Sequence, residues 1–148
     1  MITIDRESRK AVLTLKSLDK ITSRALEIGG YQAGKQLVKS TSHEILQGKK
    51  TGRVYVRSDR SGRMRRHQAS AAGETHANMT GKLRRSLSFK PSSKDLTFGY
   101  MKNAPEYAAY VEFGTSRMAH RPSLQNGMRR ETKNLENIYE KAIIDALL

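Results

Sequence analysis

The chain of 148 residues contains no cysteine, and only 6% of its residues are aromatic. The missing cysteine excludes a disulfide framework, a thiol nucleophile and a zinc site built from thiolates. Apolar runs are short, far below the roughly 20 residues of a membrane helix. The N-terminal MITIDRESRK also lacks the apolar stretch of a signal peptide. We therefore expect a chain made in the cytoplasm, with no membrane partner.

The hydrophobic fraction is low as well, at 36%. A chain of this length forms one domain of ordinary size, here taken as residues 1–148. Its core must be modest, because few large apolar side chains are available to fill it. We expect part of the burial to come from neighbouring subunits.

Positive charge is abundant and unevenly placed. The net charge is +14, and residues 48–103 hold fourteen Lys/Arg against three Asp/Glu. Residues 104–148 are balanced, with six of each. The middle third would therefore attract a polyanion or an acidic partner surface, although a solvated basic loop is the simpler interpretation.

The first third of the chain is predicted to be helical up to residue 47. Apolar residues recur at helical spacing, as at Leu18, Ile21 and Ile28. Gly29 and Gly30 interrupt the pattern, which predicts a bend or close packing against a neighbour. Residues 2–4, ITI, could form a short edge strand before the helix.

The middle third reads as strands and a loop. TGRVYVR, residues 51–57, alternates apolar and basic side chains, which is typical of a half-buried strand. Residues 58–80 have almost no large apolar side chains and are predicted to be an extended basic loop. A β-hairpin is predicted over 83–101, with strands at 83–90 and 95–101.

The last third is predicted to contain a short helix over 104–114 and a C-terminal helix over 122–147. The apolar stripe of the second helix runs through Leu124, Met128, Leu135, Ile138, Ala142 and Ala146. Together these elements predict an α+β fold. A long N-terminal helix and a C-terminal helix pack on a small antiparallel β-sheet, and a long basic loop leaves it.

No enzyme chemistry is expected, and no metal or cofactor. The segment from Gly29 to Lys35 matches the first part of a P-loop, but it lies in a helical pattern and Gln36 follows where a Ser or Thr is needed. The histidines form no metal-binding pair and are interpreted as isolated surface or loop residues: His43, His67, His76 and His120.

The stretch APEYAAYVEFGTSRMAHRP, residues 104–122, gathers three aromatics in a chain that has few. Tyr107, Tyr110 and Phe113 either fill the core under the sheet or form a subunit contact, and both uses can hold at once. Glu112 is either an exposed helix carboxylate or the partner of an arginine. The arginines considered for that ion pair are Arg84, Arg85 and Arg117.

Two segments resemble a known pattern. HQASAAGETHANMTGKLRRSL (67–87) and APEYAAYVEFGTSRMAHRPSL (104–124) are similar to the gene-product-ten-like family of tailed bacteriophages. These are the tail-completion, or head–tail joining, proteins of the phage neck. The chain departs from the family pattern at Ala72 and His76, where prolines are usual, and at Ser123, which replaces a large aromatic. Glu106 adds one residue before Tyr107.

The resemblance implies a non-enzymatic virion protein that forms a homo-oligomeric ring at the neck. Such rings are sixfold, sometimes twelvefold, and join the connector or head-closure protein to the tail terminator or tail tube. Head-to-tail contacts in a ring need two different patches on each subunit. Subunit packing is assigned to Tyr107, Tyr110, Glu112, Phe113 and Thr115.

The arginines of the basic region are assigned to a partner contact. They would meet either an acidic partner ring or the genomic DNA in the lumen: Arg60, Arg63, Arg65, Arg66, Arg84 and Arg85. The alternative function is a stand-alone basic nucleic-acid-binding protein, which the charge favours. That alternative lacks the aromatic stacking platform of a single-strand binder and a recognition-helix motif.

Overall fold

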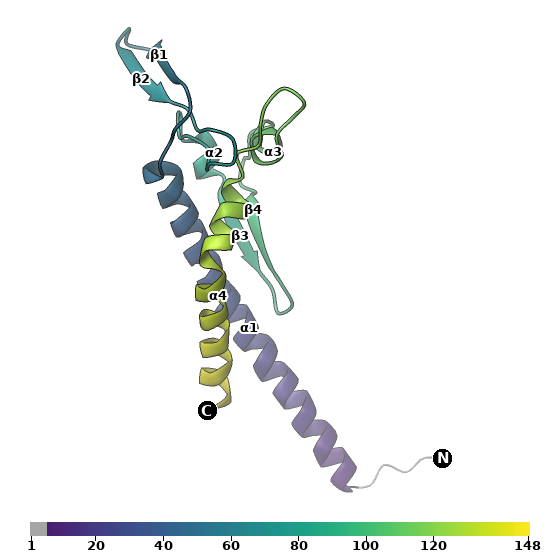
Figure 1. Cartoon of the computed structure of the whole chain (residues 1–148). Helices are drawn as coiled ribbons and strands as arrows, with labels where there is room; N and C mark the ends of the chain where they lie inside the picture. The colour runs from purple at the N-terminus through teal and green to yellow at the C-terminus, as the bar shows by residue number, and fades with distance from the viewer. Residues whose placement is uncertain (1–5) are drawn as a thin grey trace.

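The computed structural model describes residues 6–148 and confirms the predicted α+β class (Figure 1). The N-terminal ITI segment, predicted as an edge strand, lies outside the described residues. The elements follow in the order α1 (Arg6–Gln47), β1 (Val54–Ser58), β2 (Met64–Gln68), α2 (Lys82–Arg85), β3 (Leu87–Pro91), β4 (Leu96–Tyr100), α3 (Ala108–Phe113) and α4 (Ser123–Leu147).

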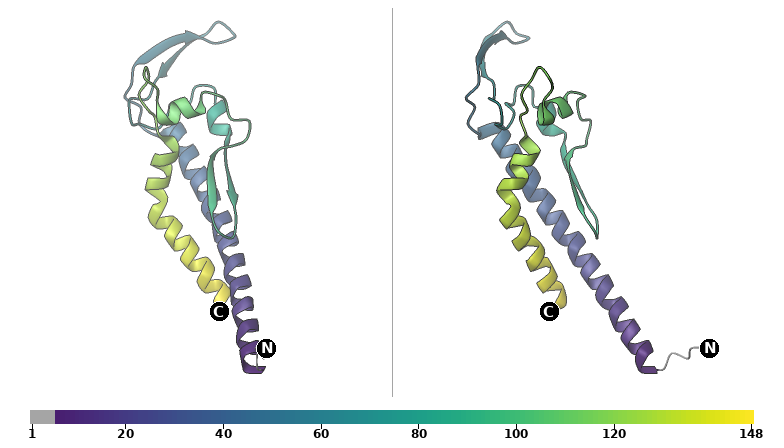
Figure 2. Two further views of the ribbon diagram at one scale, coloured as in Figure 1. Left: turned by 90° about the vertical axis from the view of Figure 1, so that its right-hand side faces the viewer. Right: turned by 45° about the vertical axis from the view of Figure 1, so that its right-hand side comes forward.

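The two long helices pack side by side, and the hairpin β3–β4 lies on another side of α1 (Figures 1 and 2). The buried face of α1 repeats every fourth residue, as do the buried positions of α4, so ridges of the same spacing meet. These positions are Ala25, Gly29, Ala33, Leu37, Thr41 and Ile45 on α1, and Ser123, Gly127 and Glu131 on α4.

Glycines let these elements approach closely. A Cβ on Gly127 would overlap the Oγ1 of Thr41, and a Cβ on Gly29 would lie 3.0 Å from the ring of Tyr139. The close-packing interpretation of Gly29 and Gly30 therefore holds, and α1 runs through both glycines without interruption. The P-loop-like segment lies inside this helix.

Neither sheet is the single small sheet that the sequence predicts. β1 pairs with β2, β3 pairs with β4, both antiparallel, and the two hairpins form separate two-stranded sheets. The predicted loop 58–80 is wrong in its first half, because residues 64–68 form β2. The predicted strand 83–90 begins instead with the helical turn α2, and its strand starts at Leu87. The short helix starts later than predicted, at Ala108.

Much apolar surface stays uncovered. β1 was predicted to be half-buried, yet all five of its residues are exposed. The N-terminal half of α1 continues beyond the end of α4 (Figure 2), and Leu13, Leu15, Leu18 and Ile21 on it are exposed. Met128, assigned to the apolar stripe of α4, is half exposed as well. No helix in the described part of the chain is long and apolar enough to span a bilayer.

Candidate functional site

The hairpin β1–β2 projects from the rest of the molecule (Figure 1), and we call residues 53–68 the arm. Its turn is organised by Asp59, whose carboxylate accepts hydrogen bonds from the Ser61 hydroxyl at 2.6 Å, the Arg63 N–H at 3.0 Å and the Arg65 Nε at 3.0 Å. The Ser61 hydroxyl is the largest of the contacts that hold the pKa of Asp59 below its usual value. Gly62 supplies the left-handed residue of the turn, with φ of 79°.

Side chains alternate along each strand, so the arm has two different faces. On one face, Arg57 lies directly opposite Arg65, next to the pair Tyr55–His67. Arg53 lies beside this face, with its guanidinium 5.6 Å from the centre of the Tyr55 ring. We call this the cationic face of the arm.

The other face of the arm carries Val54, Val56 and Met64, together with Arg66 and other polar side chains. Val56 is 56% exposed and Met64 is 69% exposed. An isolated two-stranded hairpin is only marginally stable in water. Since nothing in the described chain covers these side chains, this apolar face is a candidate contact surface.

Glu74 clamps the base of the arm. Its carboxylate accepts hydrogen bonds from the Thr51 hydroxyl at 2.6 Å, from the Thr51 N–H at 3.0 Å and from the Ala71 N–H at 2.8 Å. These bonds, led by the Thr51 hydroxyl, lower the pKa of Glu74 to about 2. The segment after the arm, which belongs to the predicted extended loop, is therefore fixed by hydrogen bonds within the chain.

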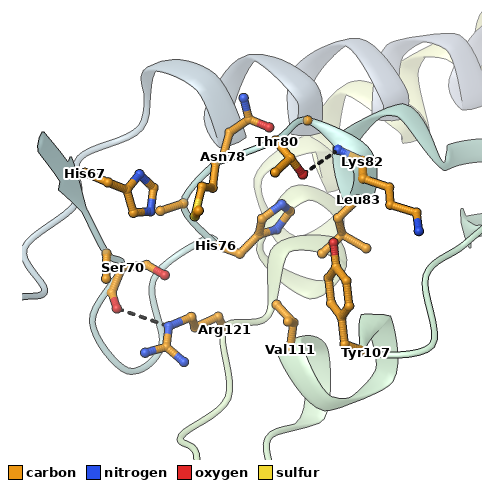
Figure 3. A pocket seen from close by; sticks show the side chains of 14 residues that line it. His67, Ser70, His76, Asn78, Thr80, Lys82, Leu83, Tyr107, Val111 and Arg121 are labelled. Atoms are coloured by element: carbon orange, nitrogen blue, oxygen red, sulfur yellow. Dashed lines mark hydrogen bonds between the residues drawn. The ribbon is translucent and has the colours of Figure 1, made fainter. Parts of the chain in front are cut away.

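The helix α3 presents two aromatics to solvent. Tyr110 is 58% exposed and Phe113 is 82% exposed, whereas Tyr107 turns toward a cavity of about 230 Å³ and keeps 43% of its surface exposed (Figure 3). The core interpretation therefore fails for Tyr110 and Phe113. Thr115 closes the turn after α3, where its hydroxyl accepts the N–H groups of Arg117 and Met118.

Glu112 corrects both interpretations made from the sequence, because it is neither exposed nor paired with an arginine. It is buried, and its carboxylate accepts the N–H groups of Leu124 at 3.0 Å and Gln125 at 3.1 Å. These are unpaired donors of the first turn of α4. Burial raises the pKa of Glu112 in spite of these bonds. The carboxylate thus fixes α3 to the start of α4.

The arginines assigned to a partner contact do not all lie together. Arg60, Arg63, Arg65 and Arg66 belong to the arm, whereas Arg84 and Arg85 belong to α2. The Nε of Arg84 is buried and has no hydrogen-bond partner among the described residues. The arm is therefore a more coherent candidate than the full set of six.

His76 was interpreted as one of the isolated surface or loop histidines. It does lie in the loop between β2 and α2, but it is buried and hydrogen-bonded. Its Nδ1 lies 2.7 Å from the Oγ of Ser123, and its backbone N–H donates to the same Oγ at 3.1 Å. The imidazole and the backbone N–H of His76 thus both hydrogen-bond to the Ser123 hydroxyl. Burial, with a smaller effect of Lys50, lowers the pKa of His76 to about 4.

A proline at position 76 would have no N–H to donate to Ser123, so this hydrogen bond requires another residue type there. Both side chains are buried, with Ser123 at 0% exposure, and His76 lines the cavity that Figure 3 shows. A substrate could not reach the Ser123 hydroxyl in this arrangement.

Within residues 6–148 no cluster of three or more His, Asp or Glu side chains is placed to hold a metal ion. Comparisons with protein-family models, with curated proteins and with solved structures find no match for this chain.

Proposed function

We propose that this chain is a non-enzymatic structural protein of a tailed-bacteriophage virion, and that it forms a homo-oligomeric ring at the head–tail junction. The ring would join the connector side of the neck to the tail tube. The proposal combines the resemblance of residues 67–87 and 104–124 with the amount of surface that the single chain leaves uncovered.

The uncovered surface is the observation that carries the proposal. The chain exposes 11186 Å², whereas a folded monomer of 16.7 kDa exposes about 7,600 Å². The excess is several times the roughly 800 Å² that each partner buries in a standard interface. It is large enough for the two contacts that each subunit makes in a ring.

The chain also offers two unlike patches, which a head-to-tail ring requires. One is the aromatic surface of α3, with Tyr110 and Phe113. The other is the uncovered N-terminal half of α1, with Leu15 and Leu18. They lie toward opposite ends of the molecule (Figure 1), so joining one to the other on a second copy generates a repeating contact.

The test is the mass of the purified full chain, measured by size-exclusion chromatography with light scattering over a range of concentrations. A sixfold ring has a mass of about 100 kDa and a twelvefold ring about 200 kDa, given 16.7 kDa per chain. Electron microscopy of the same fractions would show a closed ring. A chain that stays at 16.7 kDa, and that also fails to join purified heads or tails, contradicts the proposal.

The alternative, a stand-alone basic nucleic-acid-binding protein, is favoured by one observation, the arginine-rich arm. Binding to nucleic acid would then be a property of the monomer. A particle of 16.7 kDa that binds nucleic acid with steep salt dependence supports the alternative, and a ring of defined size supports the phage protein.

A further inference from the structure

We propose that the cationic face of the arm, together with Arg60 and Arg63 of its turn, binds the phosphate backbone of double-stranded DNA. The inference deepens the proposed function. It rests on that function only for the source of the DNA, which would be the phage genome that passes through the neck. The arm's own chemistry is the same in a ring and in a single chain.

The arm concentrates positive charge with little compensation. It carries six arginines and one acidic residue, Asp59, which pairs with Arg65 alone. The other ion pair formed by the described residues, Arg130–Glu44, lies on the helices. The arginines of the arm are Arg53, Arg57, Arg60, Arg63, Arg65 and Arg66.

The pairing of the strands places two arginines opposite each other. Arg57 and Arg65 face each other directly across the ribbon, and like charges at such positions destabilise a hairpin. Asp59 offsets the charge of Arg65, and a phosphate on this face would offset the charge of Arg57. Guanidinium groups suit that partner, because they donate in a planar fork that matches phosphate oxygens.

The shape of the arm fits a duplex. A two-stranded β-ribbon is narrow enough to enter the major groove of B-form DNA. The ribbon is exposed on both faces, and the clamp of Glu74 at its base holds it away from the helices (Figure 1). The deep, narrow major groove of duplex RNA would not admit it.

Charge composition favours DNA over an acidic protein surface. Single arginines are common in protein interfaces, but six arginines with one acidic residue give the strongly positive surface that is typical of DNA interfaces. The cationic face is dominated by arginine, and the apolar side chains of the arm lie on its other face. The two faces can therefore contact a neighbouring subunit and DNA at the same time.

The experiment measures binding of the full chain to a short fluorescein-labelled DNA duplex by anisotropy at several salt concentrations. The variant R57Q/R60Q/R63Q leaves the Arg65–Asp59 pair in place. We expect it to weaken binding at least tenfold at low salt. The slope of log K against log salt should become shallower by about three, one for each lost phosphate contact.

The matched control is R129Q/K133Q/K141Q, which removes the same charge from exposed positions of α4. It should keep the slope of the unmodified chain. Both variants are checked by thermal unfolding, and an unchanged midpoint shows that the fold is intact. Equal weakening by the two variants would overturn the inference, since binding would then follow net charge alone.

Three further probes make the outcome specific. Duplex RNA should bind more weakly than duplex DNA, and equal binding would overturn the fit to the major groove. Poly-glutamate represents an acidic protein surface. If the chain binds it more tightly than the DNA duplex, the arm contacts an acidic protein and the inference is overturned. Light scattering of the same samples separates the two proposals. A ring that does not bind DNA overturns this inference, whereas a monomer that binds DNA through the arm overturns the proposed ring.

Discussion

At the scale of single residues, Glu112 shows how a buried carboxylate can act as a structural cap. The side chain comes from α3 and accepts N–H groups from the first turn of α4. No residue of α4 itself caps this end, because its N-cap, Pro122, makes no side-chain hydrogen bond. The acceptor is therefore supplied from elsewhere, and its negative charge also suits the positive end of the helix dipole.

We expect E112A to lower the free energy of unfolding by about 1–3 kcal/mol, because two partly buried N–H donors lose their acceptor. E112Q should cost less, because an amide oxygen still accepts a hydrogen bond and burial already disfavours the charged form of Glu112. Urea denaturation measures both. E106A changes an exposed glutamate nearby and is the control. Equal loss in E106A and E112A would refute the cap.

The buried His76 makes the free energy of unfolding depend on pH, and the sign of this dependence follows from its pKa. The pKa is about 4 in the folded chain, against 6.5 for an unperturbed histidine such as that of the unfolded chain. Between these values the unfolded chain binds a proton that the folded chain does not, so the free energy of unfolding falls as the pH decreases from 6.5 to 4. The loss reaches about 3 kcal/mol at full protonation.

H76N keeps a side chain that can hydrogen-bond to the Ser123 hydroxyl, and it removes the titration. Denaturation between about pH 7 and pH 4.5 should show a flatter dependence for H76N than for the unmodified chain. Glu74, with its pKa of about 2, affects the stability only at the bottom of this window, where the carboxyl of the unfolded chain begins to bind protons, and it does so equally in both proteins. Glu112, whose pKa is raised in the folded chain, changes the stability with pH in the opposite direction, but it does so equally in both proteins. H43N, at an exposed histidine, should leave the dependence unchanged, and identical curves for H76N and the unmodified chain would contradict the assignment.

At the scale of elements, the crossing of α1 and α4 depends on the absence of a side chain at Gly127. The Oγ1 of Thr41 occupies the space that a Cβ would take and has no hydrogen-bond partner among the described residues. The helices are therefore held close by shape, at the cost of a buried hydroxyl.

We expect G127A to destabilise the chain by about 1–3 kcal/mol, because the helices must separate or Thr41 must leave its rotamer. T41A should be neutral or stabilising, since it removes an unpaired buried hydroxyl. The double variant should recover most of the loss, and a double-mutant cycle measured by urea denaturation gives the coupling. Additive effects would show that the two residues do not meet.

The elements also show what the sequence could and could not predict. The long helices follow from apolar periodicity, and the hairpin β3–β4 from its turn residues. β2 was missed because MRRHQ has no apolar alternation, and its strand depends on pairing with β1 and on the turn around Asp59.

The roles of Glu112 and His76 could not be predicted because their partners lie 12 and 47 residues away along the chain. The sequence left two uses open for Tyr110 and Phe113, core packing and a subunit contact. Core packing is wrong for both, because both side chains are exposed and the small core consists of residues such as Ala33, Leu37 and Leu87.

At the scale of the whole molecule, exposed apolar surface decides between a solitary chain and an assembled one. A monomer rarely leaves a phenylalanine 82% exposed beside an exposed tyrosine unless the patch has a partner. Phe113 and Tyr110 contribute little to the fold of the single chain. Their removal therefore tests assembly without testing folding.

We expect Y110S/F113S to unfold at the same temperature as the unmodified chain when both are monomeric, and to assemble far more weakly. Burying each aromatic contributes about 1.5–2 kcal/mol, so each subunit contact should lose about 3–4 kcal/mol, a factor of several hundred in affinity. Light scattering should then find the mass of one chain at concentrations where, by the proposal above, the unmodified protein forms rings. M128S removes a half-exposed apolar side chain from α4 and should leave the ring intact. If Y110S/F113S assembles as well as M128S does, the α3 aromatics lie outside the subunit contact, and the uncovered half of α1 and the apolar face of the arm must supply it.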